Sequence, residues 1–279
     1  MSVRRDGIIK RTLIHLILIV SAIIAVYPAL RVFGISIRPD DILYSTSLEI
    51  IPDGATFSAY MQLIFEEPFL IWLKNSLIVS FFTVVLGVTL AATAGYAFAK
   101  KRFPGRKPGL IFFLIVQMFP STMLLLPMFL LLRKINLTNS HLGLIIAYTT
   151  FVLPLCVWQM RGYYETIPDT LEEAALVDGL NQFQAFYKVI LPLASPGLVI
   201  TALFSFMSSW NEIMIAKALM QDPDMYTLPR GILNLSSRFN TEWSTFAAGS
   251  IMIMIPVVIM FLILSSYLVG GLTLGSVKG

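Results

Sequence analysis

Charge is scarce in this chain. Of its 279 residues only 13% are Asp, Glu, Lys or Arg, whereas 57% are hydrophobic. Soluble domains usually carry about 25% charged residues. A chain this apolar is therefore expected to have the lipid bilayer as its solvent. The net charge of +4 does not indicate nucleic-acid binding, because the basic residues follow the membrane topology described below.

Cysteine and histidine are almost absent. Cys156 is the single cysteine, and His15 and His141 are the two histidines. One cysteine excludes an internal disulfide, and this set is too small to hold a metal ion. Cys156 stands in an apolar run and is expected to be a small buried hydrophobic residue.

Two kinds of catalytic motif are also missing. The chain has no G-x-x-x-x-G-K-[ST] phosphate loop, which excludes ATP binding of the P-loop kind. No nucleophile–base pair lies within the apolar segments, which disfavours a membrane-embedded enzyme.

Six segments are long and apolar enough to cross a bilayer, which takes about 20 residues each. They are predicted at 12–30, 76–98, 110–132, 142–160, 197–219 and 246–269. The predicted fold is an all-α membrane protein with one transmembrane domain over residues 1–279. The first segment is not expected to be a cleaved signal peptide, because Tyr27-Pro28 followed by Arg31 does not resemble a small-residue cleavage site.

Loop charges predict the orientation. Basic residues gather before the first segment and after the second, at Arg4, Arg5, Lys10, Arg11, Lys100, Lys101, Arg102, Arg106 and Lys107. The positive-inside rule places both regions in the cytoplasm. The loop after the first segment carries Asp40, Asp41, Glu49, Asp53, Glu66 and Glu67, which fits the outside. Both termini and the polar segment 161–196 are then expected in the cytoplasm.

Prolines and small residues mark several of these segments. Pro120, Pro127, Pro154 and Pro256 each remove a backbone donor, and they fit either a packing shape or a bend at a gate. Small or hydroxyl residues recur on one face of the second segment at Ser76, Ser80, Thr83, Gly87, Ala91 and Ala94. Such a face predicts a close packing seam between helices.

The fifth segment carries a polar stripe of Ser205, Ser208, Ser209 and Glu212, with Asn211 beside it. A glutamate inside a span costs on the order of 2–3 kcal/mol unless it meets water or a partner. Two interpretations stand. Glu212 lies near the interface and pairs with a cation such as Lys217, or the stripe lines a polar cavity on a translocation path. Gln117 and Ser121, one turn apart on the third segment, are candidates for the same cavity.

The segment 161–196 is too polar to span a bilayer. Pro168 stops the preceding helix, and Thr170 with Glu173 forms a T-x-x-E pattern typical of a capping box. Gly179 is expected to end this helix, and a second helix is expected at 182–190, before Pro192 and Pro196 break the chain. Ala174 and Ala175 would let another protein approach closely. The hairpin is either a docking device or a brace for the spans.

The spacing of this segment resembles a known family pattern. Glu173-Ala174-Ala175, then Gly179, then Val189-Ile190-Leu191-Pro192 is similar to the EAA motif of ABC-importer permeases, EAA-x3-G-x9-I-x-LP, with Val189 in place of the isoleucine. The segments 209–212, 226–229, 246–249 and 269–279 also resemble carbohydrate permeases, the maltose/maltodextrin type above all. The resemblance covers nearly the whole chain.

The resemblance implies a type I importer fold with six transmembrane helices and a coupling helix-turn-helix. It implies that Glu173, Ala174, Ala175, Gly179 and Pro192 contact an ATPase. The implied partners are a second permease subunit, two ATPase subunits that bind ATP and Mg, and an external sugar-binding protein that meets the loop 221–243. The tail from Gly270 would reach the ATPase interface, and the chain itself would be non-catalytic, without a cofactor, in a bacterial or archaeal cytoplasmic membrane.

Other functions remain as alternatives. An ion-coupled secondary transporter would use Glu212 as its coupling acid. Within the importer interpretation, maltose, maltodextrin, trehalose, another oligosaccharide and a glycerol phosphate ester all fit the sequence.

Overall fold

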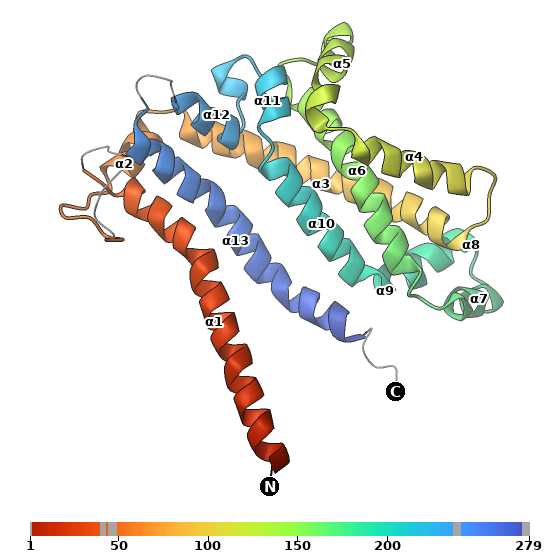
Figure 1. Ribbon diagram of the computed structural model, residues 1–279. Coiled ribbons are helices and arrows are strands. Elements are labelled where there is room, and N and C mark those ends of the chain that lie inside the picture. The colour runs from red at the N-terminus through yellow and green to blue at the C-terminus, as the bar shows by residue number, and fades with distance from the viewer. Residues whose placement is uncertain (1, 40–42, 44–48, 237–240, 275–279) are drawn as a thin grey trace. The chain divides into compact units, whose positions relative to one another are not determined.

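Every regular element in the computed structural model is a helix, within the described residues 2–39, 43, 49–236 and 241–274 (Figure 1). The all-α prediction is therefore confirmed. The elements are α1 Ser2–Ser36, α2 Ser58–Phe65, α3 Phe69–Lys100, α4 Arg106–Met118, α5 Ser121–Lys134, α6 His141–Tyr164, α7 Asp169–Val177, α8 Gln182–Ala185, the π-helix η1 Phe186–Ile190, α9 Leu191–Leu193, α10 Ser195–Trp210, α11 Met214–Leu219, the 3₁₀-helix η2 Pro223–Met225, α12 Leu228–Leu235 and α13 Trp243–Leu274.

The chain divides into two compact units. The first comprises residues 1–69 and 232–255 and holds α1, α2 and the first part of α13. Within it, the Ser36 hydroxyl lies 2.8 Å from the Tyr60 hydroxyl, and the Gln62 amide donates to Glu242 at 2.7 Å. These bonds fasten the ends of α1 and α13 to the short helix α2, so polar side chains hold the first unit together at that end.

The second unit comprises residues 70–231 and 256–279. Its centre is formed where α10 packs on α6 and α3 lies against both. A Cβ added at Gly87 of α3 would sit 3.5 Å from Val152 of α6 and 3.5 Å from Ser205 of α10. Ser76, Ser80, Thr83 and Ala91 on the same side of α3 are buried. The packing seam predicted for the second apolar segment is confirmed.

The third apolar segment is sharply bent. α4 and α5 meet at an angle of 102° around Phe119 and Pro120. A residue that precedes proline is driven out of the helical region by the proline ring, and Phe119 has ψ of 130°. Pro127, Pro154 and Pro256 instead lie inside continuous helices. The bend at Pro120 is thus local to one proline.

The fifth apolar segment differs from the prediction of one helix over 197–219. α10 ends at Trp210, and a new helix, α11, begins at Met214. The side-chain amide of Asn211 donates to the Met207 carbonyl at 2.9 Å. The Glu212 carboxylate accepts the backbone N–H of Ile215 at 2.9 Å. Polar side chains therefore bind backbone groups at this point, which ends one helix and starts the next.

Four helices in the described residues are long and apolar enough to cross a membrane, at Ile9–Ser36, Phe69–Lys100, His141–Tyr164 and Trp243–Leu264. Counting the bent pairs Arg106–Met118 with Ser121–Lys134 and Gln182–Leu193 with Ser195–Trp210 as one span each gives up to six. Six spans remain the prediction. Asp40, Asp41, residues 237–240 of the expected external loop and 275–279 of the expected tail lie outside the described residues, as do the side chains of Arg4 and Arg5.

Candidate functional site

The helix α7 contains the EAA pattern, and its two ends are set by different residues than expected. Pro168, in an extended conformation, occupies the N-cap position, and no side chain caps the helix. The predicted capping box of Thr170 and Glu173 is therefore wrong. The helix starts at Asp169, ahead of Thr170, because the fixed φ of Pro168 already sets the chain for entry into a helix.

The end of α7 agrees with the prediction. Gly179 has φ of +89°, a left-handed conformation that glycine adopts without cost. Its N–H donates to the Leu176 carbonyl at 3.1 Å, and the Leu180 N–H donates to the Ala175 carbonyl at 3.1 Å. This pair of bonds is the Schellman arrangement that terminates a helix. The chain is thereby turned toward the second helix of the hairpin.

The second helix is longer and less regular than the expected 182–190. Asn181 and Gln184 form a reciprocal capping box at its start, whereas the sequence predicts such a box in α7. The helix then widens into the π-helix η1 and continues through Pro192 in α9, so Pro192 does not break it. A proline inside a helix clashes with the carbonyl four residues before it. The π-helix η1 directly precedes Pro192, and its wider turn includes the residues whose carbonyls the proline ring would otherwise meet.

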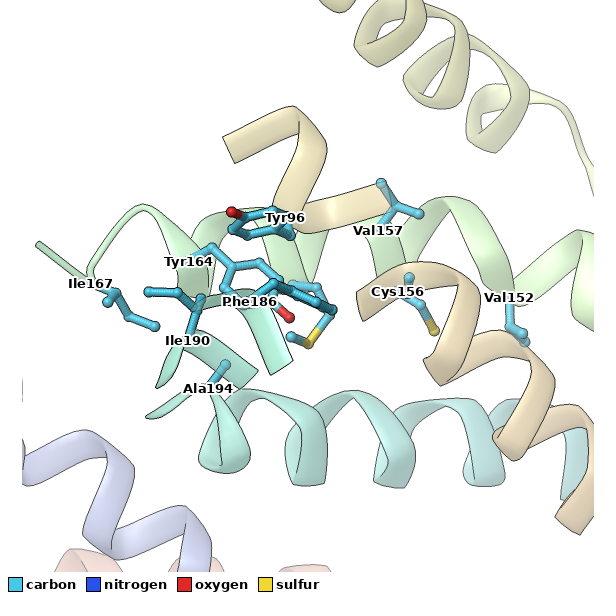
Figure 2. Close-up of a cluster of buried hydrophobic side chains, with 11 residues drawn as sticks. Tyr96, Val152, Cys156, Val157, Tyr164, Ile167, Phe186, Ile190 and Ala194 are labelled. Atoms are coloured by element: carbon cyan, nitrogen blue, oxygen red, sulfur yellow. The ribbon is translucent and has the colours of Figure 1, made fainter. Parts of the chain in front are cut away.

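A buried hydrophobic cluster holds this second helix against α3 and α6 (Figure 2). Phe186 and Ile190 from η1 pack with Tyr164 of α6 and Tyr96 of α3. The Tyr96 and Phe186 ring centroids are 4.6 Å apart, and those of Tyr96 and Tyr164 are 5.8 Å apart. Cys156 belongs to the same cluster and is 1% exposed, as its apolar surroundings in the sequence predicted.

Polar contacts attach α7 itself to the end of α3. The Tyr96 hydroxyl donates to the Glu172 carboxylate at 2.6 Å, and the Lys101 ammonium donates to the same oxygen, Oε1, at 2.5 Å. Lys100 binds Asp169 at 2.6 Å. From the sequence alone, these lysines predict only the orientation of the chain. The signal for pairing was present in the opposite signs of the basic loop after α3 and the acidic start of α7.

Two charged groups in the loops beyond the spans have shifted pKa values. Burial by itself lowers the pKa of Lys101, but its hydrogen bonds to Glu172 and Tyr96 outweigh this and raise the pKa above the usual value. The hydrogen bond and the positive charge of Lys100 lower the pKa of the Asp169 carboxyl. Both groups are therefore held in their charged forms near neutral pH.

Several large apolar side chains of the hairpin are exposed. Val177 is 88% exposed, Phe183 75% and Tyr187 63%. Glu173 and Ala174 are also exposed, as are Gly179 and Pro192, whereas Ala175 is buried. Of the two alanines expected to receive a partner, the structure exposes only Ala174. Large apolar side chains exposed in this way are typical of a protein interaction site.

A separate cavity of about 230 Å³ lies among α4, α5, α6 and the α10–α11 junction. Its polar lining includes Gln117, Ser121, Ser208, Ser209 and Glu212. Its remaining walls are Tyr148, Phe151, Val152, Leu155 and Ile215. The structure therefore brings together the polar residues of the third and fifth apolar segments, as one of the two interpretations of the stripe predicted.

Three details of that stripe differ from the sequence expectation. Glu212 binds the N–H groups of Ile215 and Ala216, and its pairing with Lys217 is not among the ion pairs of the described residues. Ser205 is buried beside Gly87 and does not line the cavity. Asn211 is exposed and binds the Met207 carbonyl.

Comparison with known proteins places the chain in a family. Residues 70–271 match the family described as binding-protein-dependent transport system inner membrane component, and the chain belongs to it. It is 36% identical over 283 residues to the galactooligosaccharides transport system permease protein GanQ of Bacillus subtilis, covering 100% of this chain and 99% of that protein. It is also 36% identical to the maltose/maltodextrin transport system permease protein MalG of Salmonella typhimurium, covering 95% of each.

A solved structure agrees with the fold. The chain superposes on a chain of a bacterial ABC transporter involved in the import of the acidic polysaccharide alginate with a TM-score of 0.76 and 26% identity, covering 96% of this chain and 98% of that one. The resemblance to permeases of carbohydrate ABC importers is confirmed, and so is the multi-pass inner-membrane class of the chain.

Proposed function

We propose that this chain is one of two permease subunits in an ATP-driven sugar importer of the maltose/maltodextrin type. An ATPase subunit would bind α7 and move the spans through it. The observation that carries the proposal is the two-sided construction of α7. Glu172 and Ala175 are buried against the chain, while Glu173 and Ala174 are exposed. One face fixes the helix to the spans and the other is free for a partner.

The partners follow from the same construction. The exposed apolar side chains of Val177, Phe183 and Tyr187 suit a groove on an ATPase subunit. Two such subunits would bind ATP and Mg, and this subunit would be non-catalytic and hold no cofactor. A second permease subunit would complete the path, an external sugar-binding protein would dock on the loop 221–243, and both termini would lie in the cytoplasm.

The cavity lined by Gln117, Ser121, Ser208, Ser209 and Glu212 is proposed as this subunit's part of the translocation path. Amide, hydroxyl and carboxylate groups suit the hydroxyls of a sugar. The names of the relatives mention different sugars, so these names do not decide the substrate. We propose maltodextrin as the first candidate, and trehalose, other oligosaccharides and a glycerol phosphate ester should be compared with it in the same assay.

The ion-coupled transporter is the second candidate function. Glu212 borders the cavity, which would suit a coupling acid. Its carboxylate is already occupied by the backbone N–H groups of Ile215 and Ala216, at 2.9 and 3.1 Å. That binding gives Glu212 a structural role at the start of α11, and this supports the ATP-driven function over the ion-coupled one.

The test is uptake of radiolabelled maltodextrin into vesicles that contain this chain with its partner permease, ATPase and binding protein. Import by the wild type should require ATP and the ATPase subunit. Glu173→Gln should lower import about tenfold or more, the effect of losing one charge-assisted contact at an interface. Asp53→Asn, which alters an exposed carboxylate far along the chain, serves as the control and should import normally.

Glu212→Gln separates the two candidate functions. It should retain ATP-driven import, because an amide oxygen can still accept a backbone N–H at the start of α11. Import that persists without any ATPase and disappears only in Glu212→Gln would show that the ion-coupled mechanism is right.

A further inference from the structure

The helix α7 is connected to its neighbours in two ways. A short turn joins it to α6, and the hairpin joins it to α10 through η1 and α9, so these two spans follow α7 through the backbone. α3 is 69–76 residues away from its α7 partners in sequence. No short backbone connection joins α7 to α3, so movement of α7 reaches α3 mainly through the contacts that the α3 side chains make. The contacts between them therefore decide whether the second span follows.

Those contacts converge on one carboxylate. Glu172 is 7% exposed, and its Oε1 receives both the Tyr96 hydroxyl and the Lys101 ammonium. The Lys101 nitrogen also lies 5.2 Å from the centre of the Tyr96 ring. Hydrogen bonds to a charged group are the strong kind, and breaking one member of a buried group is costly. The three side chains form a single, mutually supported cluster.

A second contact lies one turn earlier on α7. Lys100 binds Asp169, three residues before Glu172 and on the same side of the helix, and also donates to the Ile167 carbonyl. Two successive lysines at the end of α3 thus hold two successive turns at the start of α7. Two attachment points fix both the position and the direction of a short helix, which one point does not.

The neighbouring glutamate has no such contact. Glu173 is exposed, and the ion pairs of the described residues do not include it. The two adjacent glutamates therefore face opposite ways, Glu172 toward α3 and Glu173 toward solvent. A contact surface for the ATPase needs only the second of them.

We propose that Glu172, Tyr96 and Lys101 are positioning residues that fasten the cytoplasmic end of α3 to α7, so that the second span moves together with α7 when the ATPase displaces it. The inference rests on the proposed function. It gives Glu172 and its partners a role in addition to that of the exposed residues that would contact the ATPase. Without this cluster, the contacts that α3 keeps with α7 and η1 include the Lys100–Asp169 ion pair, whose carboxylate is exposed, and the packing of the Tyr96 ring on Phe186. An exposed ion pair contributes little, and ring packing is non-directional and allows sliding.

The predicted consequence is uncoupling of hydrolysis from import. Tyr96→Phe removes one hydroxyl and keeps the ring in the cluster, and Glu172→Gln removes the charge. Both are expected to leave assembly and ATP hydrolysis of the four-component complex near the wild-type level. The number of sugar molecules imported per ATP hydrolysed should fall about fivefold, the effect of losing one typical hydrogen bond. The measurement is parallel assay of maltodextrin uptake and phosphate release in the same vesicles.

Controls distinguish this role from a merely structural one. Glu165→Gln changes an exposed acid in the turn before α7 and should leave the ratio unchanged. Lys101→Glu alone should lower the ratio, and the exchange Lys101→Glu with Glu172→Lys should restore most of it, since the opposite charges are then re-formed.

Three results would overturn the inference. The first is an unchanged ratio in Tyr96→Phe and Glu172→Gln while the wild type imports. The second is loss of assembly in Tyr96→Phe, which would make the hydroxyl a folding requirement. The third is failure of the charge exchange to raise the ratio above that of Lys101→Glu. Absence of ATP-driven import by the wild type would instead contradict the proposed function.

Discussion

Single residues set how closely the helices of the second unit approach. A Cβ at Gly95 of α3 would lie 2.7 Å from the Met160 Cβ and 3.0 Å from the Arg161 backbone nitrogen of α6. Real Cβ atoms do not come this close, and backbone cannot rotate away. Gly95→Ala is expected to destabilise the protein by about 1–3 kcal/mol through overpacking.

The control for this substitution is Gly162→Ala, because a Cβ there meets nothing within 4 Å and alanine favours a helix. Unfolding in detergent, followed by circular dichroism, should show a lower midpoint for Gly95→Ala and an equal or higher midpoint for Gly162→Ala. Equal midpoints for the two variants would contradict the close packing of α3 on α6.

The charges that hold α7 also predict a pH dependence. The pKa of Asp169 is lowered from 3.8 in the folded protein, so its contribution is complete above 3.8 and is lost as pH falls through the lowered value. The pKa of Lys101 is raised from 10.5, so its contribution is complete below 10.5 and is lost as pH rises through the raised value. The ratio of sugar imported to ATP hydrolysed should therefore stay constant between about pH 6 and 8. A fall within that range would show that another group titrates in the coupling step.

Among the elements, the α7–α8 hairpin depends on its turn. Gly179→Ala is expected to cost roughly 1–2 kcal/mol, because alanine resists the left-handed conformation although the space around it is open. Gly179→Asn should cost less, since asparagine tolerates that conformation. Limited proteolysis of the purified subunit should detect opening of the hairpin in the alanine variant first. Equal protection in both variants would mean that the conformation of Gly179 does not limit the turn.

Sequence reasoning succeeded for this element where a residue acts through its backbone and failed where partners decide. Gly179 was identified because few residues other than glycine adopt its φ. The start of α7 was misplaced because Thr170-x-x-Glu173 fits a capping pattern, whereas Pro168 occupies the N-cap position and no side chain caps the helix. The break after Trp210 was missed because the residues that follow Asn211 and Glu212 are again largely apolar, while the cause lies in the bonds that Asn211 and Glu212 make to the backbone.

For the whole molecule, the orientation in the membrane is the prediction with the simplest test. Cys156 is 1% exposed, so the natural chain is expected to be inert to a membrane-impermeant maleimide. New cysteines at exposed sites then report sidedness. Asp53→Cys should react in intact cells, whereas Lys107→Cys and Val177→Cys should react only after the membrane is opened. Reaction of Val177→Cys in intact cells would place α7 outside and exclude contact with an ATPase.

At this scale the family could be predicted from the EAA spacing, because the pattern fixes residue types at many spaced positions at once. The sugar could not. The cavity residues of this chain come from α4, α5, α6 and α10–α11, and their meeting depends on the bend at Pro120 and the break at Trp210.

The lysines at the end of α3 have a consequence for biosynthesis. Lys100 leaves the ribosome 69 residues before its partner Asp169. During insertion of the second span the basic loop is therefore unneutralised, and we expect its full charge to act in orienting that span. Only after α6 and the start of α7 have been synthesised do the carboxylates arrive and bind two of those charges. We therefore expect the same lysines first to orient the second span and later to bind the carboxylates of α7, in the order in which the chain is synthesised.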